Sequence, residues 1–155
     1  MRRAWVFAVP LWLAPPCALA QSGGCTVLAL PVIFGTYIPF ASTPTDTTGS
    51  ITVTCSGAVP EGYAIALNAG IFGGNNFANR RMATVGGFLD YQLYSDPAHT
   101  IVWGDGTGGS NITTGPPCLS PSYCGATYTV YGRIPARQAA RPGIYADVTV
   151  VTVTF

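Results

Sequence analysis

The sequence predicts an all-β sandwich. Glycine and proline, with 19 and 13 residues, interrupt the chain every few positions and act as turn signals. Between them, Val, Ile, Thr and Tyr gather in short runs, which is the composition of β-strands. No stretch has the length and period of a convincing helix. Short strands at regular intervals, separated by turns, favour two packed sheets in a single domain.

The predicted strands follow one another with clear breaks. Pro31 separates the first two strands. The third carries Ile51 and Val53 in alternation with threonines, as expected for a strand with one buried face. Segments 70–87 and 104–115 are rich in turn residues and are predicted as loops. The predicted strands are 26–30, 32–37, 49–55, 63–67, 88–94, 101–103, 128–134 and 146–155.

The last predicted strand is strongly apolar and changes phase within its length. One phase consists of Val151, Val153 and Phe155, and the other of Ala146, Val148 and Val150. A one-residue slip exchanges the two faces of a strand, so this pattern predicts either a bulge or a change of packing partner. An apolar strand with no following element is also expected to lack one sheet neighbour, which a strand from a partner can supply.

A signal peptide is predicted over residues 1–20. Two arginines give a positive start, an apolar stretch over 4–13 follows, and a small-residue cleavage motif ends at Ala20. The apolar run is too short to span a bilayer and is interrupted by proline, and no other stretch is suited to crossing a membrane. We therefore expect an exported protein without a membrane span, whose mature domain covers residues 21–155.

The charge of the chain argues against binding to nucleic acid. Only 8% of the residues are charged, and the formal net charge is +1. Removal of Arg2 and Arg3 with the signal peptide leaves five arginines against six acidic residues, or −1. Such a chain lacks the basic surface that phosphate backbones require. Its low charge suits a protein that is packed against copies or partners.

Four cysteines remain after cleavage, and their even number in an oxidising compartment predicts disulfides. Three pairings are possible, of which we favour Cys25–Cys55, joining the first strands, and Cys118–Cys124, closing a Pro-rich loop. Each bridge is expected to stabilise the fold by about 2–4 kcal/mol. The spacings lack the close ligand pairs of a zinc site, so no metal or other cofactor is expected.

Residue types that support catalysis are few, and we predict that the protein is not an enzyme. The single histidine, His99, is expected to be solvated in a turn. Asp90 is expected to face solvent and Asp96 to cap a turn, while Asp105 alone is too little for a calcium site. Trp103 is expected in the core, with a role in sugar binding as the alternative.

An ordered set of motifs connects this chain to a known family. In this order, after a signal peptide, they resemble the spore coat protein U domain, which is shared with subunits of archaic, Csu-type chaperone–usher pili. The motifs are Phe34-Gly35-x-Tyr37, the run 49–55, Arg80-Arg81-Met82, Leu89-Asp90-Tyr91-Gln92-Leu93-Tyr94-x-Asp96, Trp103-Gly104-Asp105-Gly106, Tyr131-Gly132-Arg133-Ile134-Pro135 and Gly143-Ile144-Tyr145-x-Asp147.

The resemblance implies an incomplete immunoglobulin-like β-sandwich that lacks its final strand. In such pilins a periplasmic chaperone lends a strand, and at the outer-membrane usher the N-terminal extension of the next subunit replaces it. Cys25 and Cys55 match the early disulfide of the family, whereas Cys118 and Cys124 have no counterpart in its pattern. The terminal strand that borders the groove and is engaged by the chaperone is matched by Val151, Val153 and Phe155. The implied partners are a periplasmic chaperone, an outer-membrane usher and other pilin or coat subunits at the cell surface.

One departure from that pattern concerns the donor segment. Between the expected cleavage site and Cys25 lie only residues 21–24, which span about 13 Å. We expect a subunit that accepts a strand but does not donate one, and therefore a tip subunit or a coat protein that forms no fibre. An adhesin module that binds a surface or a carbohydrate is the alternative function.

Overall fold

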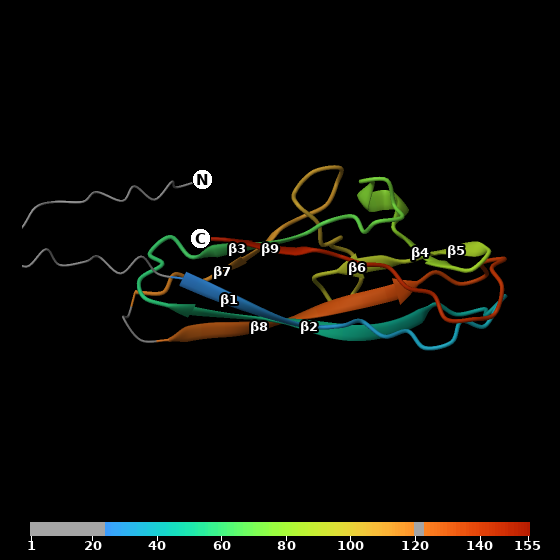
Figure 1. The fold of residues 1–155 in the computed structure, drawn as a ribbon, viewed down its shortest axis with the longest axis horizontal. Coiled ribbons are helices and arrows are strands. Elements are labelled where there is room, and N and C mark those ends of the chain that lie inside the picture. The colour runs from blue at the N-terminus through green and yellow to red at the C-terminus, as the bar shows by residue number, and fades with distance from the viewer. Residues whose placement is uncertain (1–23, 120–122) are drawn as a thin grey trace, which may run out of the picture.

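The computed structural model describes residues 24–119 and 123–155 (Figure 1). The predicted signal peptide, residues 1–20, lies outside the described residues. The regular secondary structure of the described chain is entirely β apart from one short 3₁₀ helix. Its elements are β1 (Gly24–Leu30), β2 (Thr45–Ser56), β3 (Tyr63–Leu67), η1 (Phe77–Asn79), β4 (Arg81–Thr84), β5 (Gly87–Asp90), β6 (Gln92–Tyr94), β7 (Thr113–Gly115), β8 (Cys124–Ile134) and β9 (Val151–Thr154).

Two antiparallel sheets form two layers of an elongated molecule (Figure 1). One sheet has the strand order β1-β2-β8-β6 and the other the order β7-β3-β9. The small β4-β5 hairpin lies at the end of the molecule away from the C-terminus (Figure 1). The long strands β2 and β8 pair from Thr45 opposite Ile134 to Cys55 opposite Cys124, and they form the centre of the first sheet.

This strand order is that of an immunoglobulin-like sandwich. In the immunoglobulin scheme β1, β2, β8 and β6 take the positions of strands A, B, E and D, and β3 and β9 take those of C and F. Strand G of that scheme lies beside F. Among the described residues no strand occupies that place, since β9 pairs with β3 alone. The predicted all-β, immunoglobulin-like fold is thus confirmed, with an open edge at the final strand position.

The hydrophobic core lies between the two sheets. Trp103 is only 1% exposed, and its indole Nε1 donates a hydrogen bond to the carbonyl of Ile65 at 3.1 Å. Both sheets contribute apolar side chains, because alternate residues of each strand face inward. The buried core residues include Ile51, Val53, Tyr63, Leu67, Met82, Leu89, Leu93, Val130 and Ile134.

Several short strands differ from the prediction. The predicted strand 88–94 is divided into β5 and β6 at Tyr91, whose N–H donates to the carbonyl of Arg80 at 3.1 Å. The predicted loops 70–87 and 104–115 contain β4 and β7. Strands of three or four residues are too short to show a period in the sequence, which explains both omissions.

Residues 32–37 were predicted as a strand but form none, apart from a bridge between Tyr37 and Gly143. The expected alternation is nevertheless present, because Val32 and Phe34 are half-buried and Ile33 is 70% exposed. A ladder requires a hydrogen-bonded neighbour, and no described strand pairs with this segment. The segment therefore lies unpaired beside an unoccupied position and turns at Gly35.

The terminal segment 146–155 contains a strand only in β9. The chain changes its partner here, since Ala146 bridges to Ala83 whereas β9 pairs with β3. This is the change of packing partner given as one of the two predicted alternatives, and it occurs without a change of face. Odd-numbered residues from 145 to 153 are at least partly buried, while Val148 and Val150 are exposed. The sequence pattern therefore reflected a change of neighbour together with exposed valines, and not a slip in the strand.

Candidate functional site

A groove of about 600 Å³ lies along the position of the unfilled strand. Residues 29–36 form one wall, and residues 144–149 with Val151 form the other. Core side chains line its floor, so the hydrophobic core opens to solvent here. Residues 29–34, before the turn at Gly35, span about 20 Å if extended, which is the length of a β-strand. The floor consists of Ile51, Leu67, Met82, Tyr91, Leu93 and Val130.

The edge of β9 beside the groove has free hydrogen-bonding groups. Val150 directs both of its backbone groups at Asn68: its carbonyl accepts from the Asn68 N–H at 3.0 Å, and its N–H donates to Oδ1 at 2.9 Å. Residues of an antiparallel strand alternate between its two edges. The N–H and C=O of Val151 and Val153 therefore point away from β3, and Leu67, opposite Val151, correspondingly donates its N–H to Gly104. A further strand can pair with β9 at these groups.

Two glycines allow the first wall to cross close above the sheet. A Cβ on Gly49 would lie 2.7 Å from the carbonyl oxygen of Leu30 and 2.9 Å from Val32. A Cβ on Gly132 would lie 2.5 Å from Val32 and 2.8 Å from the Phe34 ring. Any larger residue at either position would push the wall segment into the groove or away from the sheet.

Side chains hold the second wall where its backbone changes partner. Asp147 Oδ1 accepts hydrogen bonds from the N–H groups of Ile71, at 3.0 Å, and Val148, at 2.8 Å. Asp147 Oδ2 accepts from the Tyr91 hydroxyl at 2.7 Å. A Cβ on Gly70 would overlap this carboxylate, so only glycine leaves room for it. The backbone makes no ladder between Ala146, which bridges to β4, and Val151, which pairs with β3. In this interval the side chains of Asp147 and Asn68 supply the hydrogen bonds instead.

A buried arginine lies next to this carboxylate. Arg80 is 1% exposed, and its Nη2 donates to the Trp103 carbonyl at 2.8 Å. Within the described chain its Nε and Nη1 have no hydrogen-bond partner. Burial lowers the pKa of Arg80, an effect that neighbouring Tyr91 and Asp147 oppose, and burial raises the pKa of Tyr91 to about 12. Tyr91 therefore stays a hydrogen-bond donor to Asp147 at physiological pH.

The three residues predicted to bind a partner strand have different places. Val151 lines the groove, and Val153 is half-buried against the core two residues further along β9. Phe155 is 57% exposed and lines a separate hollow of about 370 Å³ with Glu61, Tyr63 and others. The wall 29–36 and the group around Asp147 received no role in the prediction, although Arg80, Tyr91 and Asp147 all lie in its motifs.

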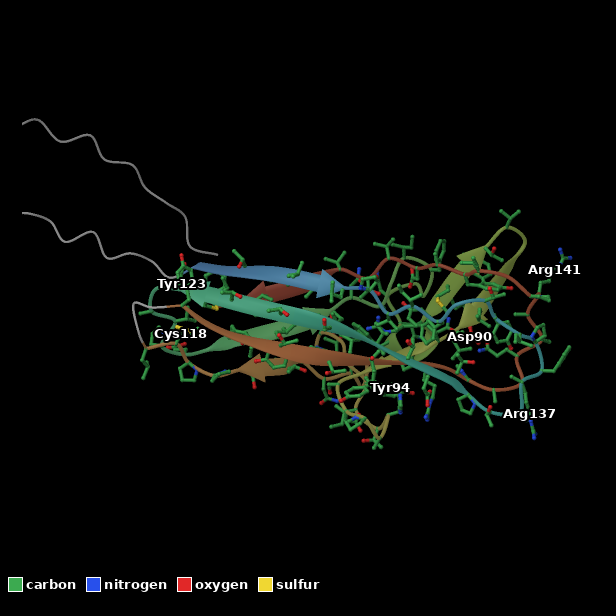
Figure 2. The ribbon with its side chains drawn as sticks, turned by 90° about the horizontal axis from the view of Figure 1, so that it is seen from below. Asp90, Tyr94, Cys118, Tyr123, Arg137 and Arg141 are labelled. Carbon is green, nitrogen blue, oxygen red and sulfur yellow. A yellow bond between two sulfur atoms is a disulfide. The ribbon has the colours of Figure 1, made fainter. Side chains whose placement is uncertain are left out.

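The four cysteines form two disulfides in the structure, Cys25–Cys55 and Cys118–Cys124. Cys25 and Cys55 lie directly opposite each other on β1 and β2. Cys118 lies at the end of the molecule where β1 begins, near Tyr123 (Figure 2). The first disulfide anchors the strand that leads into the groove wall.

The residues weighed for catalysis have structural roles. Asp90 is exposed and pairs with Arg81 at 3.0 Å, and Asp96 caps its turn by accepting from the N–H of Ile101 at 2.7 Å. His99 was expected to be solvated, but its side chain is 10% exposed, because the turn folds it edge-on against Tyr94 and Tyr131.

Asp105 binds the hydroxyl of Thr107 and caps a turn, and the burial of Trp103 leaves it no surface for a sugar. Among residues 24–119 and 123–155 there is no group of three or more His, Cys, Asp or Glu side chains suited to a metal. The same residues include no helix long and apolar enough to cross a membrane.

A small loss of stability in acid is expected from Asp46. Its carboxylate accepts two hydrogen bonds of 2.7 Å from Arg133, which hold its pKa below the ordinary 3.8. A lowered folded-state pKa gives stability that is present above pH 3.8 and lost as the pH falls through the folded value. Because Asp46 is 43% exposed, the contribution is expected to stay below about 1 kcal/mol. Urea titrations at several pH values should show that Asp46→Asn removes this acid-dependent part.

Comparisons with known proteins agree with the fold. The family model of the Spore Coat Protein U domain matches residues 11–154. No curated protein sequence gives a significant match. A chain in the crystal structure of the CsuC–CsuE chaperone–tip adhesion subunit pre-assembly complex, from archaic chaperone–usher Csu pili of Acinetobacter baumannii, has a similar fold, with a TM-score of 0.55 and 23% sequence identity over 86% of the present chain.

That alignment covers 40% of the Acinetobacter chain, so the present chain matches less than half of it. The family match extends over most of the sequence and indicates a structural subunit rather than an enzyme. The chain belongs to the Spore Coat Protein U domain family.

Proposed function

We propose that the protein is an exported structural subunit of a chaperone–usher surface fibre, and that its groove binds a β-strand donated by another polypeptide. The observation that carries this proposal is the groove itself, which lies beside β9 where the sandwich has no strand. Family membership and a fold shared with a chain from a chaperone–subunit complex support the same class of function.

The chemistry of the groove defines the donated strand. Its inward side chains must be apolar to cover the floor, and its backbone must pair with the free groups of Val151 and Val153. Each apolar side chain that it buries contributes about 1.5–3 kcal/mol, against about 1–2 kcal/mol for ordering each residue. Because only alternate residues of the strand face inward, these two contributions nearly cancel, and a strand without large apolar anchors is not expected to bind.

The order of partners follows from the need to cover this apolar opening. A periplasmic chaperone fills the groove after export, and another subunit replaces the chaperone at the outer-membrane usher. A coat that assembles from copies without a fibre would use the same groove. Affinity capture of the tagged protein from its native periplasm separates the two cases, because a chaperone is expected with a fibre subunit.

The groove itself is tested by supplying the strand in cis. A flexible linker and a seven-residue strand with alternating apolar residues are added after Phe155. Filling the groove is expected to raise the Tm by about 10 °C or more, since 1 kcal/mol corresponds to roughly 4 °C in a domain of about 130 residues. The control carries serine at the inward positions of the same strand. Equal Tm values for the two fusions would rule out strand binding.

The position of the subunit in the assembly depends on its mature N-terminus. If cleavage follows Ala20, four residues precede Cys25, and we propose a terminal position in which the subunit accepts a strand and donates none. Mass spectrometry of the intact exported protein measures this directly. A mature chain that begins well before Gln21 would contradict the terminal position while leaving the groove proposal intact.

A further inference from the structure

Three of the four disulfide cysteines lie on one line across the first sheet. Cys55 of β2 is directly opposite Cys25 of β1 on one side and directly opposite Cys124 of β8 on the other. Residues opposite each other in a ladder project their side chains from the same face, with Cβ atoms about 4.5–5.5 Å apart. Cys55 therefore has a cysteine neighbour on each side, each within about 1 Å of the Cβ separation of a disulfide, although only Cys25 is bonded to it.

This line of cysteines favours disulfide exchange. A thiolate attacks a disulfide sulfur and displaces the other sulfur as the leaving group. Because β2 lies between β1 and β8, Cys124 is on the side of Cys55 away from Cys25. A free thiolate at Cys124 would attack the Cys55 sulfur with Cys25 in the leaving position. Cys124 is prevented from doing so because its own sulfur is bonded to Cys118.

We infer that the Cys118–Cys124 disulfide is a lock that keeps Cys124 from exchanging with the Cys25–Cys55 disulfide. Without it, the Cys124 thiol loses its proton to solvent and forms a bond to Cys55. The Cys25–Cys55 bond breaks, and the Cys25 thiolate takes up a proton. The step conserves one disulfide and one thiol, so it needs no oxidant. It frees β1 from β2 at the start of the strand that leads into the groove wall.

The strand register predicts different behaviour for variants at Cys118 and at Cys124. Cys118→Ala leaves a free thiol at Cys124, next to Cys55, whereas Cys124→Ala leaves a free thiol at Cys118. Cys118 lies opposite Val59 and has no place in the line of cysteines. Both variants lose the same bridge, and their stability is therefore expected to fall by similar amounts, while only Cys118→Ala is expected to exchange.

The test uses the exported protein at pH 8.5, near the ordinary pKa of a cysteine thiol of about 8.5. Free thiols are alkylated after timed incubation, and non-reducing peptide maps locate them. In Cys118→Ala the label is expected to move from Cys124 to Cys25 in at least about a tenth of the molecules, together with a Cys55–Cys124 peptide. In Cys124→Ala the label should remain on Cys118.

The double variant Cys118→Ala/Cys124→Ala shows whether the domain folds without the lock, because it should keep the Cys25–Cys55 peptide and no free thiol. Label that stays on Cys124 in the folded Cys118→Ala variant would overturn the inference. Equal label on Cys25 in both single variants would also overturn it, since exchange would then not depend on the line of cysteines. If Cys118→Ala does not fold, wild-type protein with limiting reductant provides the same measurement, and reduction without any Cys55–Cys124 peptide would contradict the inference.

Discussion

Replacing Asp147 with alanine is expected to lower the free energy of unfolding by about 3 kcal/mol or more. The change removes the acceptor for the N–H groups of Ile71 and Val148 and for the Tyr91 hydroxyl. Hydrogen bonds to charged groups each contribute about 1.5–3 kcal/mol. It also removes a negative charge that lies near the positive charge of buried Arg80. Two nitrogens of Arg80 have no hydrogen-bond partner in the described chain, so the loss of this charge leaves the buried guanidinium less well compensated. Chemical denaturation of the purified variant measures the loss.

The matched control is Asp46→Ala. Asp46, like Asp147, accepts short hydrogen bonds, in its case two from Arg133, but its side chain is 43% exposed. Its loss is therefore expected to cost less than about 1 kcal/mol. Hydrogen exchange should localise the effect of Asp147→Ala, with faster exchange at Ile71 and Val148. Similar costs for the two variants, or unchanged exchange at these amides, would show that Asp147 does not hold the groove wall.

Much of the fold could be predicted from local patterns. The strand 63–67 was predicted with the bounds of β3, because strict alternation of Tyr63, Ile65 and Leu67 with alanine marks one buried face. The central strands β2 and β8 were found for the same reason, although each is longer than predicted. The β4-β5 hairpin is missed, since the prediction places Gly86-Gly87 in a loop, whereas Val85-Gly86 forms a two-residue turn and Gly87 begins β5.

The site could be predicted only in part. The apolar terminal strand and the family resemblance predict Val151, Val153 and Phe155 as partner-binding residues, and of these only Val151 lines the groove. The second wall was beyond such reasoning, since its hydrogen bonds, between Asp147 and Ile71 and between Val150 and Asn68, join residues far apart in the sequence. Likewise, the conformation of residues 31–36 depends on the missing sheet neighbour and on the space above Gly49 and Gly132. Neither can be read from the alternation of apolar and polar residues within the segment.

Val153→Asp is expected to abolish stabilisation by a strand supplied in cis, whereas Thr152→Asp is expected to retain it. The two residues are adjacent on β9, but Val153 faces the core opposite Ile65, which is 0% exposed, and Thr152 is exposed. A carboxylate at Val153 would lie at the edge that the donated strand covers. Burial there without a partner costs several kcal/mol, which is enough to cancel the gain from the strand.

Because Val153→Asp also weakens the unfilled domain, its Tm alone does not isolate strand binding. The informative quantity is the difference in Tm between the apolar and serine-bearing fusions, measured in each background as a double-mutant cycle. In the Thr152→Asp background this difference should stay near the wild-type value, because the outer face of β9 does not meet the strand. In the Val153→Asp background it should fall below about a third of that value. A difference that survives Val153→Asp would mean that the added strand stabilises the domain at another place, and the groove beside β9 would then no longer explain its assembly.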